Sequence, residues 1–228
     1  MKHSSKRYKE LTKKVEKILY SPEEAVNVLK NTATAKFEES AEAHVSLNID
    51  PKYADQQLRA TVIFPFGTGK KVRVVAIVKD TELYNPSELK VEKIGSENLI
   101  EEINQGYLDF DVLIAQTEMM PKLAKLGRLL GPRGLMPSAK AGTMTNDVKS
   151  AIEEFKKGKI EYRVDKTGIV HVNFGKTNFQ ASELIENLRT FYRSIMENKP
   201  TGVKGRYFKS FHLCSTMGPS IEIDWNIF

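Results

Sequence analysis

The strongest constraint on the fold is a run of alternating strand and helix patterns in the middle of the chain. It begins with Val72–Val78, an almost wholly apolar segment that is typical of a strand buried on both faces of a parallel sheet. Asp111–Ala115 is a second segment of this kind, and Val91–Ile94 is a shorter one. Helix patterns accompany these strands at Ser96–Ile103 and Asp147–Lys157. Repeated β–α alternation predicts a small, open, parallel α/β sheet.

A further helix is predicted over Pro121–Leu130, with Leu123, Leu126 and Leu130 on one side. A basic loop rich in glycine and proline follows it, and on physical grounds this loop is a rigid, positively charged surface connection. The loop does not have the glycine spacing of a dinucleotide-binding fingerprint, and the helix precedes it instead of following it.

Two glycine-containing links bracket the middle segment, at Pro65–Gly69 and at Lys157–Lys159. Two chain crossings between domains are what an inserted domain requires. We therefore expect a discontinuous α+β domain over residues 1–66 and 159–228, and an inserted, three-layer, Rossmann-like α/β domain over residues 67–158. The fold class is α/β.

The outer segments are predicted to contain both helices and half-buried strands. Ser21, Pro22 and Glu24 form a helix start with a capping box. The other expected elements are a basic amphipathic helix over Lys2–Lys17, strands over Ala43–Ile49 and Leu58–Phe64, a hairpin of Ile160–Val164 and Ile169–Phe174, and a long helix over Leu184–Ile195.

Charge is unevenly distributed along the chain, which has a net charge of +6. The middle segment, 67–158, carries 14 Lys+Arg against 13 Asp+Glu, whereas the outer segments together carry 21 against 16. This excess suits a polyanionic partner and places a nucleic-acid surface on the outer segments. Lys204, Arg206 and Lys209 add positive charge before the last strand pattern.

The single cysteine, Cys214, excludes an internal disulfide framework and a metal site built from clustered cysteines. We expect Cys214 to be a small buried or half-buried core residue and His44 to be a plain surface histidine. No metal and no cofactor is predicted. No apolar run reaches the ~20 residues of a membrane span, and the first residues lack the apolar region of a secretory signal. We expect a soluble protein in a reducing compartment, without a membrane partner.

The stretch Lys209–Ser220 combines a strand with a constrained turn. Phe211 and Leu213 alternate with polar residues, and Ser215–Pro219 then reverses the chain. The turn presents a hydroxyl, backbone N–H groups and the thioether of Met217 at the end of a strand. Such a surface suits contacts with RNA backbone and 2′-hydroxyl groups, although a simple hairpin with a buried methionine has the same pattern.

Two blocks carry a resemblance to a known family. Ser-Thr-Met-Gly-Pro-Ser at Ser215–Ser220 and Lys-Leu-Gly-Arg-Leu-Leu-Gly-Pro-Arg-Gly-Leu-Met-Pro at Lys125–Pro137 resemble the large-subunit ribosomal protein L-one family. The resemblance covers essentially the whole chain and implies the same division into two domains. The variant with Cys214 before the first block also resembles plastid members, so the expected location is a large ribosomal subunit in the bacterial cytoplasm or, for an organelle-encoded copy, in the plastid stroma.

The resemblance implies a monomer when free that binds large-subunit rRNA at the mobile stalk, assists the release of exit-site tRNA, and represses its own mRNA. In the family, the segment equivalent to Lys36 and Phe37 belongs to the RNA surface, and the Asp-Lys-Thr-Gly turn at Asp165–Gly168 lies beside it. The expected RNA contacts are Lys36, Phe37, Asp165, Lys166, Thr167, Ser210, Thr216, Met217 and Gly218. Asp165 would act by orienting a base or a neighbouring lysine.

Two other functions compete with this interpretation. An enzyme that uses a nucleotide on the middle domain is suggested by Gly67-Thr68-Gly69-Lys70, but Phe64 stands at the first glycine of a P-loop and Lys71 at its Ser/Thr. No nucleophile lies beside a general base in the sequence, so no catalytic residue is predicted. The third candidate is a translational repressor that has no place on the ribosome.

Overall fold

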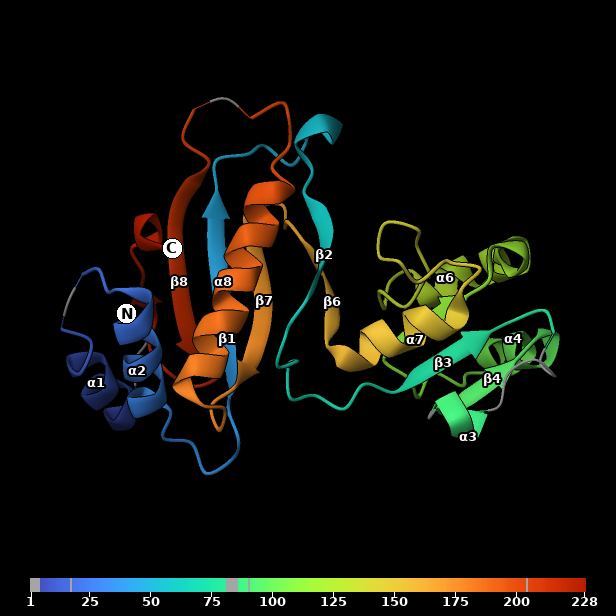
Figure 1. Cartoon of the computed structure of the whole chain (residues 1–228), viewed down its shortest axis with the longest axis horizontal. Coiled ribbons are helices and arrows are strands. Elements are labelled where there is room, and N and C mark those ends of the chain that lie inside the picture. Colours follow the sequence, from blue (N-terminus) through green and yellow to red (C-terminus); the bar gives the residue numbers. More distant parts are fainter. Residues whose placement is uncertain (1–4, 17, 81–85, 90, 204) are drawn as a thin grey trace. The chain divides into compact units, whose positions relative to one another are not determined.

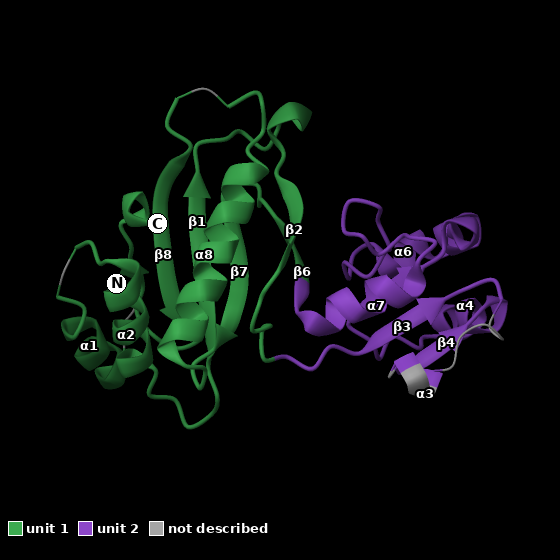
Figure 2. Ribbon diagram, in the orientation of Figure 1, with its two compact units in different colours: residues 1–69, 160–228 green, residues 70–159 purple. Residues whose placement is uncertain are grey.

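The computed structural model describes residues 5–16, 18–80, 86–89, 91–203 and 205–228. Lys2, Lys17 and Lys204, which the sequence suggested as parts of basic segments, lie outside these residues. The chain divides into two compact units, Met1–Gly69 with Ile160–Phe228, and Lys70–Lys159. Figure 2 shows the two units in different colours. No helix among the described residues is long and apolar enough to cross a membrane.

Unit 1 is built on an antiparallel sheet whose strand order, in the described part of the chain, is β7-β1-β8-β9 (Figure 1). The strands are β1 (Ser40–Leu47), β7 (Ile169–Lys176), β8 (Phe208–Ser215) and β9 (Ile221–Glu222). Alternate residues of β1 are buried, from Ala41 to Leu47. The strict period of two therefore divides the sheet into a core face and a polar face.

Helices α2 (Pro22–Thr32) and α8 (Ala181–Glu197) cover the core face, packing Leu29, Leu188 and Phe191 against Phe211 of β8. The capping box predicted for Ser21 and Glu24 is present, and Pro22 occupies the first turn of α2. The basic helix α1 spans Lys6–Lys13 and begins at an N-cap formed by Ser5.

The predicted hairpin of the segments 160–164 and 169–174 is only partly correct. Its turn forms, because Asp165 N donates to Ile169 O at 2.9 Å and Gly168 N donates to Asp165 O at 3.3 Å. The strands then diverge: β6 (Lys159–Arg163) pairs with β2 (Arg59–Ile63), whereas β7 pairs with β1. Burial favours this divergence of the strands. Tyr162 and Val164 are buried in the core next to β2, while β7 forms part of the main sheet.

The link after β2 is held by a buried side chain of α8. Asn187 is fully buried, and its Nδ2 donates to Gly67 O and to Phe174 O, each at 2.9 Å. Its Oδ1 accepts a hydrogen bond from Phe66 N at 3.3 Å. A buried amide with satisfied donors and acceptor fixes the chain where it leaves unit 1.

Unit 2 contains a parallel sheet with the described strand order β4-β3-β5, formed by β4 (Lys93–Gly95), β3 (Val74–Ile77) and β5 (Val112–Ala115). Val75 and Ile77 pack with α4 (Glu97–Asn104), while Val74 and Ala76 pack with α7 (Val148–Lys157). Both faces of β3 are thus covered, which explains its continuous apolar sequence. A short helix, α3 (Pro86–Leu89), precedes β4.

Residues 121–130 are helical, as predicted, but they do not form one regular α-helix. The structure has short pieces here: η3 (Thr117–Met119), α5 (Met120–Leu123), η4 (Ala124–Leu126) and α6 (Gly127–Leu130). The 3₁₀ turn between Leu123 and Leu126 gives these residues a spacing of one turn, and both are buried with Leu130. The three leucines are therefore buried together, although the helical segment that carries them is irregular.

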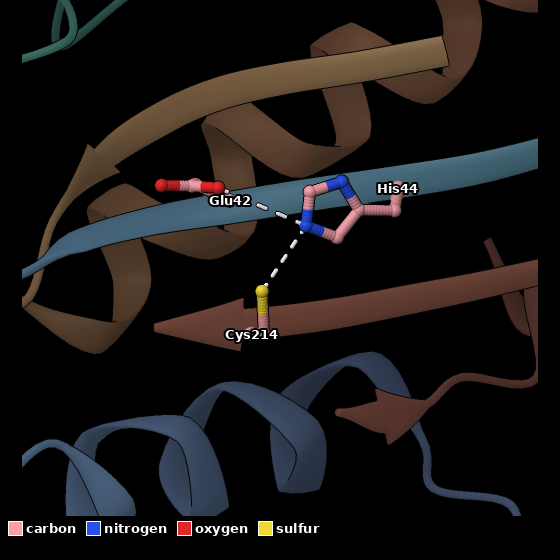
Figure 3. Close-up of side chains that lie close together, drawn as sticks. All are labelled: Glu42, His44 and Cys214. Carbon is pink, nitrogen blue, oxygen red and sulfur yellow. Dashed lines mark hydrogen bonds and ion pairs between the residues drawn. The ribbon is translucent and has the colours of Figure 1, made fainter. Parts of the chain in front are cut away.

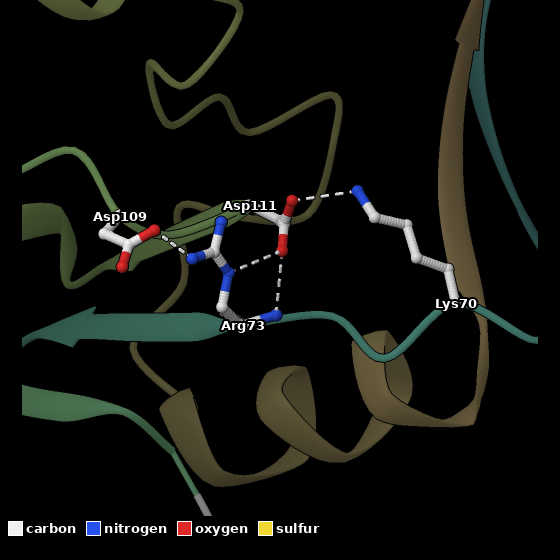
Figure 4. A network of polar contacts seen from close by, with 4 residues as sticks. All are labelled: Lys70, Arg73, Asp109 and Asp111. Carbon is white, nitrogen blue, oxygen red and sulfur yellow. Dashed lines mark hydrogen bonds and ion pairs between the residues drawn. The ribbon is translucent and has the colours of Figure 1, made fainter.

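An ion-pair network ties the start of β3 to β5 (Figure 4). Asp111 Oδ2 accepts hydrogen bonds from Arg73 N at 3.1 Å and Arg73 Nε at 3.3 Å, and Asp111 Oδ1 accepts one from Lys70 Nζ at 2.8 Å. The guanidinium of Arg73 also pairs with Asp109. The hydrogen bond from Lys70 and those from Arg73 lower the pKa of Asp111 to about 2.

We predict that Asp111→Asn lowers the stability of unit 2 by about 1 kcal/mol at pH 7, a value kept small because Lys70 is 59% exposed and screened by solvent. A pKa below that of the unfolded chain stabilises the fold above about pH 4, and the stabilisation is lost as the pH falls towards 2. The loss caused by the mutation should shrink over the same range. Hydrogen exchange of the β3 and β5 amides measures this.

Asp109→Asn is the matched control, because it removes the same charge from a side chain that is 78% exposed. It should change the exchange rates by much less. Equal effects of the two substitutions at pH 7 would contradict the role assigned to Asp111.

Candidate RNA-binding surface

The expected RNA contacts form two groups at opposite ends of the main sheet. Lys36 and Phe37 lie in the loop before β1, and Thr216, Met217 and Gly218 lie in the turn after β8. These two segments are neighbours, because Ala41 near the start of β1 pairs with Ser215 at the end of β8. We call Lys36, Phe37, Thr216, Met217 and Gly218 the turn group.

The second group lies at the other end of β1. Ser46 pairs with Ile169 of β7 on one side and with Ser210 of β8 on the other. The turn that contains Asp165, Lys166 and Thr167 immediately precedes Ile169. We call Asp165, Lys166, Thr167 and Ser210 the hairpin group.

The polar face of the sheet connects the two groups. Its side chains alternate with those of the core and are partly or fully exposed. They are Glu42, His44, Ser46, His171, Asn173, Ser210, His212, Cys214 and Glu222.

The turn group is organised by Glu39, a buried carboxylate that the sequence interpretation overlooked. Glu39 is 1% exposed. Its Oε1 accepts a hydrogen bond from Ala35 N at 2.9 Å, and its Oε2 accepts hydrogen bonds from Met217 N at 2.9 Å and Ser215 Oγ at 2.7 Å. One side chain therefore fixes both the loop that carries Phe37 and the turn that carries Met217.

Glu39 remains ionised because of these bonds. Burial by itself would raise the pKa of its carboxyl, but the hydrogen bonds from Ala35, Ser215 and Met217 and the charge of Arg7 outweigh burial, and the pKa lies below its usual value. Arg7 of α1 also donates from Nη2 to Met217 O at 3.1 Å. The basic helix thus contacts the turn group directly.

Backbone contacts complete this arrangement. Thr216 N donates to Ser40 O at 3.1 Å, Ser40 N donates to Thr216 Oγ1 at 3.0 Å, and Gly218 N donates to Ser215 O at 3.0 Å. A Cβ on Gly218 would lie 2.4 Å from Ser215 Oγ. Because Glu39 holds that hydroxyl, glycine is required at position 218 for the close approach.

The turn presents two large apolar side chains to solvent beside positive charge. Phe37 is 56% exposed and Met217 is 49% exposed, while Lys36 is exposed next to Phe37. Glu39 accepts hydrogen bonds from the backbone N–H groups of Ala35 and Met217, which lie in the same two segments. An exposed aromatic ring beside a lysine can stack on a base or sugar while the ammonium attracts phosphate.

Asp165 has a clear structural task in the hairpin group. Its Oδ1 accepts hydrogen bonds from Thr167 N, Thr167 Oγ1 and Ile169 N, each at 2.8 Å. Burial opposes ionisation, but these hydrogen bonds prevail and the pKa of Asp165 falls to about 2. The carboxylate therefore shapes the turn that exposes Lys166 and Thr167.

Comparison with known proteins agrees with the resemblance seen in the sequence. Residues 29–219 match the Ribosomal protein L1p/L10e family. The chain belongs to this family. Large ribosomal subunit protein uL1c of Guillardia theta is 57% identical over 224 residues, which cover 98% of this chain and 96% of the relative. Large ribosomal subunit protein uL1 of Prochlorococcus marinus (strain MIT 9215) is 54% identical over 226 residues, covering 99% and 96%.

Membership of the L1p/L10e family makes this chain a ribosomal protein and not an enzyme. The nucleotide-using alternative on the middle segment is therefore wrong. Within the described structure, Gly67–Lys70 leads into the strand β3. A phosphate-binding loop would instead open a helix.

We predict that Glu39→Gln weakens the turn group. An amide offers one acceptor oxygen in place of two, and its NH₂ group must face a donor at Ala35 or Met217. Loss of charge-assisted hydrogen bonds at a buried site should lower the free energy of unfolding by about 2 kcal/mol. Hydrogen exchange at the Met217 amide should accelerate.

Glu38→Gln is the control, because it makes the same change at the exposed neighbouring residue. Its stability and its Met217 exchange should match those of the wild type. If Glu39→Gln behaves like Glu38→Gln, the buried carboxylate does not hold the turn.

Proposed function

We propose that this protein is a structural constituent of the large ribosomal subunit and binds its rRNA at the mobile stalk through the turn group and the hairpin group. The observation that carries the proposal is the exposed pair Phe37 and Met217, held in place from below by Glu39. The backbone that carries these side chains is ordered before RNA binds, so its ordering takes little from the contact energy.

The spacing of the two groups supports recognition of a folded RNA. The eight residues of β1, Ser40–Leu47, separate them by roughly 23 Å at the usual rise per residue of a strand. An RNA that contacts both ends must follow the polar face with its backbone. Such a surface selects RNA by shape and by 2′-hydroxyl contacts more than by sequence.

Positive charge surrounds the polar face and would supply the long-range attraction. Arg7 and Lys36 lie at one end, and Lys166 and Lys209 lie towards the other and are exposed. Lys176 Nζ donates to Ser40 Oγ at 3.0 Å at the edge of the sheet. Binding should weaken as salt rises, since the lysines and arginines displace counterions from the RNA.

The proposal extends to two further RNA partners. On the ribosome, the protein would assist the release of deacylated exit-site tRNA. A segment of its own mRNA that folds like the stalk would occupy the same surface, and the protein would then repress its translation. The shared basis is shape recognition by the polar face, which any RNA with the stalk geometry would satisfy.

We predict that Phe37→Ala lowers affinity for stalk rRNA by about 1–3 kcal/mol, the usual cost of removing one stacked aromatic ring. Stability should be almost unchanged, because the ring is 56% exposed in the free protein. A filter-binding titration at fixed salt measures affinity, and thermal unfolding measures stability.

Tyr53→Ala is the control, since Tyr53 is an aromatic residue of unit 1 that is 60% exposed and belongs to neither group. Its affinity should equal that of the wild type. Unaltered binding by Phe37→Ala, with specific binding intact in the wild type, would remove the turn group from the interface. Phe37 tests this better than Thr216, whose hydroxyl also accepts the Ser40 N–H.

We also predict that unit 1 carries most of the RNA affinity. The strands β2 and β6 pair with each other, and Val164 N, just after β6, donates to Leu58 O, just before β2, at 3.0 Å. The strands are therefore antiparallel, and the chain leaves and re-enters unit 1 at the same end. Replacing residues 70–158 by a short Gly/Ser linker should leave affinity within about fivefold, or about 1 kcal/mol.

Titration of the shortened protein with stalk rRNA and with an arbitrary duplex measures this. Circular dichroism must first show that the shortened chain is folded. A folded chain that binds stalk rRNA no better than the duplex would assign an essential part of the binding surface to unit 2.

A further inference from the structure

The polar face holds a cluster of potential metal ligands at its centre (Figure 3). His44 Nε2 lies 3.1 Å from Cys214 Sγ and 3.8 Å from Glu42 Oε2. The ligand atoms of Glu42, His44 and Cys214 all lie within 4.8 Å of one another. The three side chains are half-buried, so one side of the cluster remains open to solvent.

We propose that Glu42, His44 and Cys214 bind a divalent transition-metal ion of the zinc class, with a water molecule as the fourth ligand. A thiolate, an imidazole and a carboxylate form a donor set that suits Zn²⁺, and they do not suit Mg²⁺ or Ca²⁺, which prefer oxygen alone. Bonds of about 2.0–2.3 Å from one ion require ligand atoms roughly 3.3–3.8 Å apart in a tetrahedron. The observed separations need only small side-chain rotations to meet this.

Strand register explains why these residues meet. Glu42 and His44 are two residues apart on β1 and therefore share a face. Glu42 is directly opposite Cys214 of β8. Side chains on directly opposite residues have Cβ atoms about 5 Å apart, so the backbone of two paired strands already holds the three ligands together.

The second nitrogen of His44 is also engaged. His44 Nδ1 lies 2.8 Å from Nδ1 of His171, and His171 Nε2 lies 3.6 Å from Asp165 Oδ2. With His44 donating from Nδ1 and His171 presenting its N–H to Asp165, the lone pair of His44 Nε2 points at Glu42 and Cys214. Metal-bound histidines typically have such a partner on the other ring nitrogen, which fixes the tautomer and the ring orientation.

Protonation is compatible with metal uptake. Burial, together with His171 and His212, lowers the pKa of His44, which favours the neutral imidazole that a metal ion binds. Burial and the charge of Glu42 raise the pKa of the Cys214 thiol to about 11. Formation of the metal–sulfur bond must therefore release the thiol proton to solvent, without any redox step.

The cluster is invisible in the sequence because His44 and Cys214 are 170 residues apart. In the sequence, each residue is considered by itself. The sequence therefore predicts a plain surface histidine at His44, a core cysteine at Cys214 and no metal. Strand pairing unites them in the structure. The site lies between the turn group and the hairpin group, but its existence does not depend on RNA binding.

The test uses the intact, chelator-treated protein titrated with Co²⁺ in the absence of RNA. Wild-type protein should bind one ion, with a sulfur-to-cobalt charge-transfer absorption and the intense visible bands of four-coordinate cobalt. Zn²⁺ should displace it and should raise the thermal unfolding midpoint. Cys214→Ser should lose the charge-transfer band and bind at least about tenfold more weakly.

His212→Gln is the matched control, because His212 lies on the same face of β8, pairs with Glu222 at 3.9 Å and is outside the cluster. It should keep the band and the affinity. His171→Ala should keep the band but weaken binding about tenfold, and His171→Gln, whose amide oxygen can accept the Nδ1 proton, should restore much of the loss. These variants separate ligands from the positioning residue.

Cobalt that binds without a sulfur band, or equally well to wild type and Cys214→Ser, would overturn the proposal. The His44–Cys214 contact would then be a hydrogen bond only. Since no RNA is present, such a failure would leave the proposed rRNA binding untouched. Loss of stalk binding by Phe37→Ala would in turn say nothing about the metal.

Discussion

The buried carboxylate of Glu39 is the interaction on which the candidate surface depends. An ionised group with 1% exposure is stable only if its oxygens are satisfied, and here the donors come from Ala35, Ser215 and Met217. These donors belong to two segments far apart in the sequence. The need to satisfy one charge therefore fixes the relative position of the loop and the turn, and the exposed side chains of Phe37 and Met217 follow from it.

The same strand alternation that builds the core also builds the polar face. Odd-numbered residues of β1 are buried and even-numbered ones face outward, so every outward residue of β1 is in register with one on a neighbouring strand. This regularity places the turn group and the hairpin group at the two ends of one surface. It also brings His44 and Cys214 together without any dedicated loop.

The two units differ in how their sheets are covered and in how their polar residues are held. Unit 1 presents a half-exposed antiparallel sheet, and its polar residues are held by specific hydrogen bonds such as those of Asn187 and Asp165. Unit 2 buries both faces of a small parallel sheet between helices, and the Arg73–Asp111 network ties the start of β3 to the start of β5. The charge distribution differs in the same way. The middle segment is nearly neutral, whereas the outer segments carry the positive charge that a polyanion-binding surface needs.

The sequence by itself determined the elements with strong local signals. Four elements are encoded within a few residues, where periodicity and capping chemistry decide. They are the capping box at Ser21, the buried strand at Val74–Ile77, the helix at Val148–Lys157 and the alternation of Phe211 and Leu213. Family membership was also recognisable from two short blocks. The alternation of β1, extended back by one step, places Glu39 on the buried side, and that signal could have revealed it.

Tertiary structure alone decided which distant residues meet. Strand pairing and burial decide the divergence of β6 from β7, the donors around Glu39, and the cluster of Glu42, His44 and Cys214. Several of these contacts join residues more than a hundred positions apart. Local sequence cannot specify such contacts, because they are chosen by the packing of the whole core and by the need to satisfy each buried polar group.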